Sequence, residues 1–250
     1  MARYKLTLEY DGGPFVGWQR QDNGPSVQAA LEAAVFRFCG ERTTVQGAGR
    51  TDTGVHASGQ VAHVDIEKTT DATTVAKALN AHMKPAPIAV LAAEAVGQDF
   101  HARFSATGRR YLYRILCRPS RPALLRGRVW WVPQTLDPAA LQAGADRLIG
   151  HHDFSSFRAS ECQAASPEKT LDALRIESRD RGLDGLEIRV HAAARSFLHH
   201  QVRNMVGTLR LVGQGKWSPE QVTRALQAKE RRAAGPTAPA EGLYLTEVTY

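Results

Sequence analysis

The sequence GAGRTDTGVHA, residues 47–57, places three glycines around an Arg, a Thr and an Asp. A β-branched run, residues 42–46, precedes it. Residues 60–66 follow and alternate between apolar and polar or small side chains, as a half-buried strand does. The pattern predicts a tight loop between two strands. Because glycine permits unusual backbone angles and close approach, the loop would hold Asp52 exposed but fixed in position.

Two familiar loop types do not fit these residues. A phosphate-binding P-loop ends in Lys followed by Ser or Thr, and neither is present. A dinucleotide-binding loop needs a third glycine where Asp52 stands, and a helix behind it. Two interpretations remain. Either Asp52 takes part in chemistry, with Arg50 keeping it ionised or gripping an anionic substrate, or it caps the N–H groups of an ordinary turn.

The rest of the chain reads as a mixture of strands and helices. Strands are predicted over residues 3–10, 88–96, 109–117, 171–178, 186–193 and 243–250. Helices are predicted after the capping residues Ser26, Asp71, Asp137 and Ser218, and over residues 197–212. The patterns indicate an α+β fold with a mixed, mostly antiparallel sheet flanked by helices. No linker separates the first half, residues 1–105, from the second, residues 106–250, so we expect the halves to abut.

The charge of the chain favours a polyanionic partner. The formal net charge is +7, and 25 of the 32 basic residues are Arg. Eight of these fall between Arg103 and Arg128, interleaved with Tyr111 and Tyr113. Arg grips phosphate with two parallel hydrogen bonds and stacks on bases. A GC-biased genome would account for the ratio of Arg to Lys, but not for the clustering.

Several other classes of protein are disfavoured. The cysteines are Cys39, Cys117 and Cys162, an odd number at wide spacing, which indicates neither a disulfide framework nor a zinc site. The run His151-His152-Asp153 invites a metal interpretation, but adjacent side chains rarely point at one ion, so no metal is predicted. No signal peptide or membrane span is visible, and we expect a cytoplasmic protein with no membrane partner.

The string GRTDTGVHA resembles the catalytic loop of the TruA family of tRNA pseudouridine synthases, G-R-T-D-x-G-V-H. Thr53 stands where many members carry Ala. Four further blocks resemble the family and run in family order: FHARFSA at residues 100–106, RRYLY at 109–113, FLHHQVRNMVG at 197–207 and EGLYL at 241–245. The resemblance therefore extends over nearly the whole chain.

This resemblance implies a fold and an activity. The fold would be pseudouridine synthase-like, with two similar halves, a basic cleft between them and Asp52 at the floor of that cleft. The enzyme would be a homodimer that needs no cofactor. It would isomerise uridine to pseudouridine at positions 38, 39 and 40 in the anticodon stem-loop of tRNAs. The residues agree with this chemistry, because no redox change or phosphate cleavage occurs and one carboxylate suffices.

The resemblance also implies roles for individual residues. Asp52 would be the nucleophile, and Arg50 and Arg203 would hold it ionised. Arg50 would also take the place of the uridine among the stacked bases of the RNA when the uridine is flipped out. Tyr111 resembles the active-site tyrosine, which stacks under the uracil or takes part in proton removal. Further candidates for substrate contact are His56, Arg103, Arg109 and Arg110.

Two rival functions are weaker. A non-catalytic RNA-binding module would leave Asp52 unexplained, because a fixed anion near phosphate weakens binding. A hydrolase with paired carboxylates would need a second acidic residue, and none stands in the motif blocks near Asp52. The residues leave open whether the reaction passes through an adduct at the base, an adduct at the sugar or a glycal.

Overall fold

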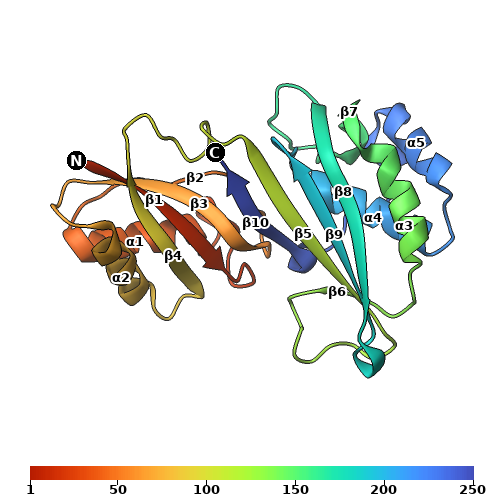
Figure 1. The fold of residues 1–250 in the computed structure, drawn as a ribbon, viewed down its shortest axis with the longest axis horizontal. Coiled ribbons are helices and arrows are strands. Elements are labelled where there is room, and N and C mark those ends of the chain that lie inside the picture. The colour runs from red at the N-terminus through yellow and green to blue at the C-terminus, as the bar shows by residue number, and fades with distance from the viewer. The chain divides into compact units, whose positions relative to one another are not determined.

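The computed structural model describes residues 1–250, which form two compact units. The first comprises Met1–Thr107 and Tyr244–Tyr250, and the second comprises Gly108–Leu243. Each unit contains β-strands with helices packed against them (Figure 1). The α+β class with a mixed, mostly antiparallel sheet is confirmed. The assignment of functional halves to residues 1–105 and 106–250, and the similarity of these halves, stay predictions.

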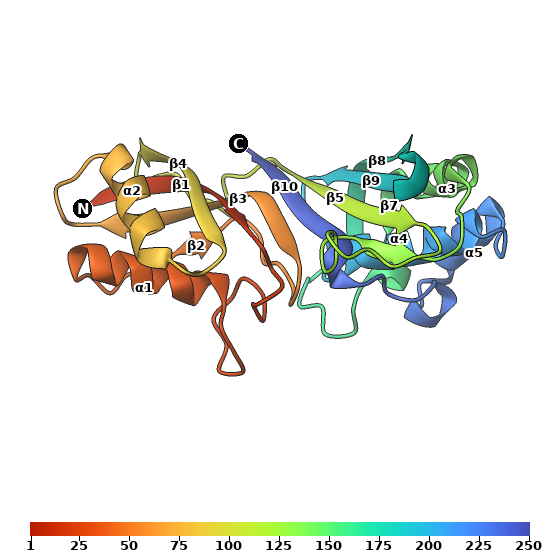
Figure 2. The same ribbon diagram turned by 90° about the horizontal axis from the view of Figure 1, so that it is seen from below.

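In the first unit the strand order is β4–β1–β3–β10. The strands are β1 (Ala2–Tyr10), β3 (His56–Ile66), β4 (Ile88–Val96) and β10 (Leu243–Thr249), and β2 (Gln46–Gly47) pairs with β3. β1 is antiparallel to both β3 and β4, whereas β10 runs parallel to β3. Helix α1 (Val27–Cys39) packs against α2 (Ala72–Met83), which also contacts β4 (Figure 2).

The predicted alternation of β1 is confirmed. Tyr4, Leu6, Leu8 and Tyr10 are at most 4% exposed, so one face of the strand faces the core. The predicted caps of all four capped helices are also confirmed, at Ser26, Asp71, Asp137 and Ser218. Such a cap typically stabilises a helix by about 1 kcal/mol.

The strand expected over residues 42–46 is largely wrong, because β2 contains only Gln46–Gly47. The backbone of Val45 is bonded to side chains of α1 instead. Its N–H donates to the Glu32 carboxylate at 3.1 Å, and its carbonyl accepts from the Gln28 amide at 3.2 Å. Helix α1 therefore takes the backbone groups that a strand would use for pairing.

In the second unit the strand order is β5–β9–β8–β7, with β6 parallel to β5. The elements are β5 (Gly108–Cys117), β6 (Trp130–Val132), α3 (Pro138–Ala145), β7 (Gly150–Asp153), β8 (Glu168–Asp180), β9 (Leu186–Ala194), α4 (Gln201–Gly213) and α5 (Pro219–Ala228). Helix α3 packs against both β8 and α4 (Figures 1 and 2).

Helix α4 begins four residues later than predicted, at Gln201. His200 adopts a left-handed conformation with φ 62°, which a continuing helix excludes. The Leu198 N–H donates to the Gln201 side chain at 2.8 Å, so a local side-chain bond replaces a helical turn there. Once started, α4 is deeply buried, with Met205 and Leu209 inaccessible to solvent.

None of the helices combines the length and the apolar character needed to cross a membrane.

The block at residues 100–106 is tied to the sheet of the first unit through His63. This side chain is 4% exposed, and its Nδ1 accepts from the Ala102 N–H at 3.1 Å. The Tyr250 hydroxyl donates to the carbonyl of Ala102 at 2.8 Å. Burial, helped by Arg3 and His101, lowers the pKa of His63 to about 4. The imidazole is therefore neutral in the folded protein at physiological pH.

His63 is expected to make the fold sensitive to mild acid. The unfolded chain protonates this residue near its ordinary pKa of about 6.5, whereas the folded chain resists protonation until about pH 4. The contribution of His63 to the free energy of unfolding is complete above pH 6.5 and is lost as the pH falls towards 4. Between pH 7.5 and pH 5 this loss amounts to about 2 kcal/mol. The free energy of unfolding in urea should be measured at both pH values for the wild type and for His63→Gln, whose amide does not titrate. Between pH 7.5 and 5, the wild type should lose more of this free energy than the variant does, by the same amount. Parallel pH profiles for both proteins would contradict this assignment.

Candidate functional site

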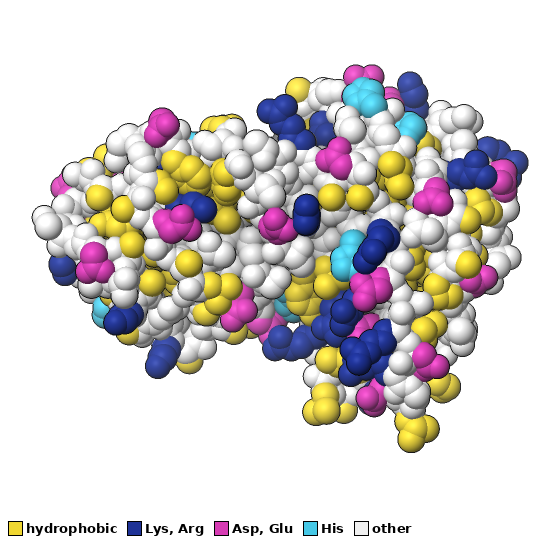
Figure 3. Space-filling model, viewed as in Figure 1, with side chains coloured by type: hydrophobic (Ala, Val, Ile, Leu, Met, Phe, Trp, Pro, Cys, Tyr) yellow, Lys and Arg dark blue, Asp and Glu magenta, His cyan; other side chains and the backbone are white.

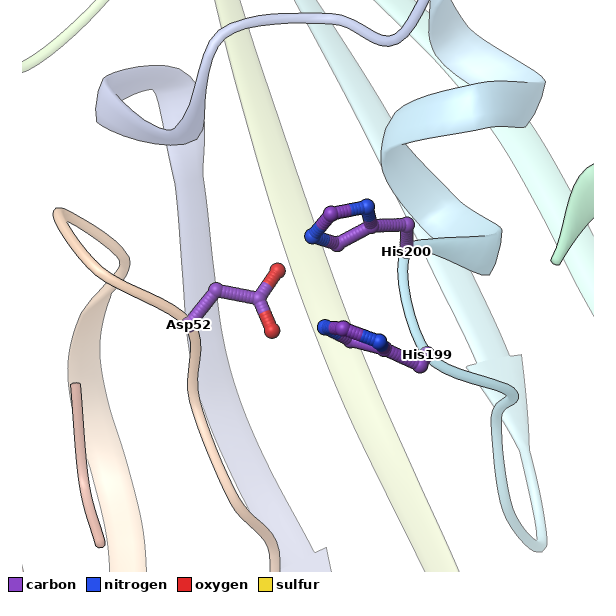
Figure 4. A group of neighbouring side chains, drawn as sticks. All are labelled: Asp52, His199 and His200. Atoms are coloured by element: carbon purple, nitrogen blue, oxygen red, sulfur yellow. The ribbon is translucent and has the colours of Figure 1, made fainter. Parts of the chain in front are cut away.

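Asp52 lies in the loop between β2 and β3, as predicted, and is partly exposed (Figure 4). The loop turns sharply just after it. The Val55 N–H donates to the carbonyl of Asp52 at 3.1 Å, and Gly54 adopts φ 78°, which suits glycine. The predicted tight loop is therefore present, although the strand before it is shorter than expected.

The loop is held from below by buried polar side chains. The Gln60 amide nitrogen donates to the carbonyl of Gly49 at 2.7 Å and to the Tyr10 hydroxyl oxygen at 3.4 Å. The Tyr10 hydroxyl in turn lies 2.9 Å from the hydroxyl of Thr51. Gln60, Tyr10 and Thr51 are all at most 6% exposed. Buried hydrogen bonds of this kind fix the backbone on the N-terminal side of Asp52.

Tyr10 acts in this network as a neutral hydroxyl. Burial raises its pKa to about 12, despite hydrogen bonds to Thr51 and Gln60 that lower it. Because its oxygen accepts from Gln60, its hydrogen is available to donate to Thr51. A neutral tyrosine can therefore support the loop without placing a second negative charge close to it.

A second segment, residues 11–18, packs against the same loop. The backbone N–H of Trp18 donates to the carbonyl of Thr51 at 3.0 Å, and the Thr53 hydroxyl donates to the carbonyl of Val16 at 3.0 Å. The contact at Gly17 admits no side chain, because a Cβ there would lie 2.5 Å from the oxygen of Thr51. Trp18 is only 3% exposed, so it is a buried support of the loop rather than a surface for stacking on a base.

His56 has a supporting role that the sequence did not reveal. It is 1% exposed, its Nδ1 accepts from the Gly12 N–H at 3.0 Å, and its ring stacks on Tyr244 at 4.7 Å. It therefore links the end of β1, the loop that carries Asp52 and β10 within the first unit. Contact between His56 and the substrate stays a prediction.

Arg50 is exposed and forms no hydrogen bond or ion pair in this structure. The direct pairing with Asp52 considered above stays a prediction. An unengaged guanidinium on a rigid loop is well placed to meet an incoming anion, since it has no protein partner to give up.

In the second unit, Tyr111 and Arg203 are each held by a neighbouring segment. Tyr111 lies on β5 and meets the ring of Phe197 edge-on, with 5.1 Å between the ring centroids. Arg203 lies on α4, and its Nε donates to the carbonyl of Ala238 at 2.8 Å. The Ala238 N–H donates back to the carbonyl of Arg203 at 3.1 Å. Residues 109–113 and 197–207, which resemble two family blocks, thus meet in space.

The remaining basic candidates differ in their surroundings. Arg103 is exposed, with its guanidinium 5.5 Å from the ring centre of Phe104, itself 74% exposed. Arg109 donates to the carbonyl of Arg195 at 2.7 Å. Arg110 is exposed. Contact between these three arginines and a substrate stays a prediction.

Within the arginine cluster at residues 103–128, Arg114 serves the fold. It lies 2.9 Å from the carboxylate of Glu187, which is 2% exposed and also meets Arg181 and Arg189. Burial raises the pKa of Glu187, but bonds from Arg189 and Arg114 bring it below its usual value. Figure 3 shows Lys and Arg gathered with acidic side chains over the strands of the second unit. Charge counting along the sequence could not separate these paired arginines from the others.

His199 and His200 lie on the segment that enters α4 (Figure 4). Their ring centroids are 4.1 Å apart. The sequence marked them only as part of a family block and assigned them no role.

The chain matches known proteins over most of its length. A sequence model of the family described as tRNA pseudouridine synthase matches residues 7–105 and 145–250. The chain belongs to this family, so the resemblance drawn from the motifs is confirmed. Asp52 and Arg203 fall within the matched residues, whereas Tyr111 falls between them.

Relatives with the name tRNA pseudouridine synthase A align with the whole chain. The proteins from Paramagnetospirillum magneticum and Rhodospirillum centenum are both 62% identical over 250 residues, covering 96% and 100% of those relatives. The protein from Rhodospirillum rubrum is 58% identical, with 88% of its length covered. A solved Cbf5–Nop10–Gar1 complex matches 97% of this chain and 49% of its own chain, with a TM-score of 0.38 at 12% identity.

The buried support of the loop can be tested without any substrate. Tyr10→Phe removes the hydroxyl bonded to Thr51, and faster amide hydrogen exchange is expected in the peptide covering residues 47–57. Tyr4→Phe is the matched control, because Tyr4 lies on the same strand, is 2% exposed and donates to the carbonyl of Thr70 at 2.8 Å. Each substitution should cost about 1 kcal/mol of stability. Equal exchange of the loop peptide in both variants would show that Tyr10 does not hold it.

Proposed function

We propose that this protein isomerises uridine to pseudouridine within tRNA, with Asp52 as the nucleophile. The observation that carries the proposal is a partly exposed carboxylate on a rigidly supported loop, in a chain that belongs to the tRNA pseudouridine synthase family. The reaction breaks the N1–C1′ bond of the uridine and forms a C5–C1′ bond to the same sugar. C5 loses a proton and N1 gains one, so atoms and electrons balance without an external reactant.

The support of the loop suits this chemistry. An attacking carboxylate must lie within a few tenths of an ångström of its productive position, and a misplacement of about 1 Å can cost about 100-fold in rate. Tyr10, Gln60 and Trp18 hold the backbone beside Asp52 through hydrogen bonds that are shielded from water. The loop therefore does not have to be ordered when the RNA binds. A passive turn would not require such support on both sides.

Three further residues are proposed to act on the same uridine. Arg50 and Arg203 favour the ionised form of Asp52, and Arg50 also replaces the flipped base in the RNA stack. Tyr111 stacks under the uracil or accepts a proton through its hydroxyl. Tyr111→Phe separates these roles, because the variant keeps the ring for stacking and loses only proton transfer.

The substrate and the assembly follow from the family resemblance. We propose that the target is the anticodon stem-loop at positions 38, 39 and 40, that the enzyme works in the cytoplasm without a cofactor, and that it is a homodimer. A basic cleft for the RNA stays a prediction. Light scattering at micromolar concentration tests the dimer, and a fully active monomer would exclude it.

Asp52→Asn is expected to abolish pseudouridine formation while the protein folds and binds tRNA. Asn has nearly the same shape and can still accept a turn hydrogen bond, so a purely structural Asp52 predicts only a small loss. Asn carries no charge and is a poor nucleophile, so the catalytic role predicts a loss of several orders of magnitude. Asp52→Glu should fail as well, since the extra methylene displaces the carboxylate by about 1 Å. Single-turnover tritium release from C5-labelled uridine in tRNA measures the rate, and filter binding measures affinity.

The control for this prediction is Asp71→Asn, the same chemical change at the cap of α2, where the carboxylate accepts from the Thr74 N–H at 2.9 Å. Its turnover should equal that of the wild type. If Asp52→Asn kept more than about a tenth of the wild-type rate, a barrier change under about 1.4 kcal/mol, the carboxylate could not be the nucleophile.

A further inference from the structure

The second unit contains a cavity of about 260 Å³ at the start of α4. Arg231, His199, His200, Asn204 and Thr237 line it, together with residues 159–161. Sites for drug-sized ligands usually measure about 300–1,000 Å³. The cavity is therefore better suited to a small group such as a phosphate than to a whole nucleotide. Most of its polar lining can donate hydrogen bonds, and the single carboxylate is that of the exposed Glu161.

Arg231 brings a positive charge that the protein does not neutralise. Its guanidinium donates to the carbonyl of Gly235 at 2.8 Å, to the Asn204 amide oxygen at 3.1 Å and to the Thr237 hydroxyl at 3.0 Å. All three acceptors are uncharged, and Arg231 forms no ion pair in this structure. A partly buried cation without a counter-ion is costly, which points to an external anion. Three of the five guanidinium N–H groups are used, so two remain for that anion.

The orientation of the guanidinium is set in advance. Asn204 is inaccessible to solvent, its amide nitrogen donates to the carbonyl of Phe157 at 2.8 Å, and its oxygen also accepts from Thr237 at 2.7 Å. On the next turn of α4 the Thr208 hydroxyl accepts from the Gly235 N–H at 2.9 Å. A guanidinium held in one orientation loses little entropy when it binds a phosphate.

The first turn of α4 adds to the positive potential at this cavity. His200, the N-cap residue, and Asn204, one turn later, both line the cavity. His200 has φ 62° and no side-chain bond caps the helix. Although the Gln201 N–H donates to the carbonyl of Leu198 at 3.0 Å, the positive end of the helix dipole lies beside the cavity and favours an anion there.

We propose that this cavity binds one phosphodiester group of the RNA substrate, with Arg231 as its principal ligand. The proposal rests on the proposed function for the identity of the RNA, and it adds a backbone contact to the residues that act on the uridine. A phosphate contact of this kind positions the RNA and carries no sequence preference.

The first test compares Arg231→Met with Arg232→Met. Arg232 is the next residue, is exposed and undergoes the same loss of charge. Affinity for tRNA is measured between about 50 and 200 mM salt. Loss of one phosphate contact should reduce the slope of log K against log salt by about 0.7–0.9 in Arg231→Met, with about tenfold weaker binding at the middle of this range. Equal slopes in wild type and Arg231→Met would overturn the proposal, as would an equal change in Arg232→Met.

A second test locates the phosphate. Anticodon stem-loop RNAs each carry one neutral methylphosphonate, and every RNA is titrated against wild type and Arg231→Met. At one position the methylphosphonate should weaken binding to the wild type but should not weaken binding to Arg231→Met any further. This non-additivity is the signature of a direct pair in a double-mutant cycle. Additive losses at every position would refute the contact.

Two further measurements test the need for a guanidinium and the identity of the anion. Arg231→Lys keeps the charge but loses the guanidinium that Asn204 and Thr237 orient. It should fold, keep the salt slope and bind at least threefold more weakly, and wild-type affinity would overturn the role of the oriented guanidinium. If inorganic phosphate raised the melting temperature of wild type but not of Arg231→Met, and no methylphosphonate position coupled, the cavity would bind free phosphate instead of RNA. Tritium release by the wild-type enzyme is scored separately, so its absence would refute the proposed function and not the anion site.

Discussion

The hydrogen bond between Tyr10 and Thr51 meets the main physical constraint on this protein, which is that a loop with a charged, partly exposed side chain must be held in place from the core. An exposed carboxylate cannot be anchored by burying it, because desolvation would favour its neutral form. The structure anchors the backbone beside it instead. Gln60 and Tyr10 are buried side chains of the sheet, and each forms a hydrogen bond with the loop, at Gly49 and Thr51 respectively. The loop is thus held in place although the side chain of Asp52 stays in contact with water.

The second unit solves a similar problem with the same kind of residue. Asn204 is a buried amide on α4, as Gln60 is a buried amide on β3, and both form hydrogen bonds with segments outside the α-helices and β-strands. Each amide can donate and accept at once, so one side chain satisfies groups on two sides. A hydrophobic residue at either position would fill the space but leave buried carbonyls or hydroxyls without partners, at a cost of about 1–3 kcal/mol for each group.

The elements of the fold that follow from local rules were predictable from sequence. Alternation located β1, and the side chains of Ser26 and Asp71 located the starts of α1 and α2. The errors arose where a side chain bonded the backbone in place of the expected pattern: side chains of α1 bonded the backbone of Val45, and the Gln201 side chain bonded the Leu198 N–H and delayed the start of α4. The identity of the loop around Asp52 was visible, because glycine spacing and a family motif agree there. Its support by Tyr10 and Gln60, and the engagement of Arg114 by Glu187, were hidden because these pairs are far apart along the chain.

The pairing of β10 with β3 has a consequence for the synthesis of the protein. Residues 244–250 belong to the first unit, yet the ribosome makes them only after the whole second unit. At 5–20 residues per second, the first unit waits roughly ten seconds for its last strand. During that time the stretch of β3 at His56 and Ala57 lacks its β10 partner, and His56 lacks the ring of Tyr244 on which it stacks. The nascent first unit therefore exposes an unpaired strand edge, the kind of surface that chaperones protect from aggregation, until translation reaches the final residues.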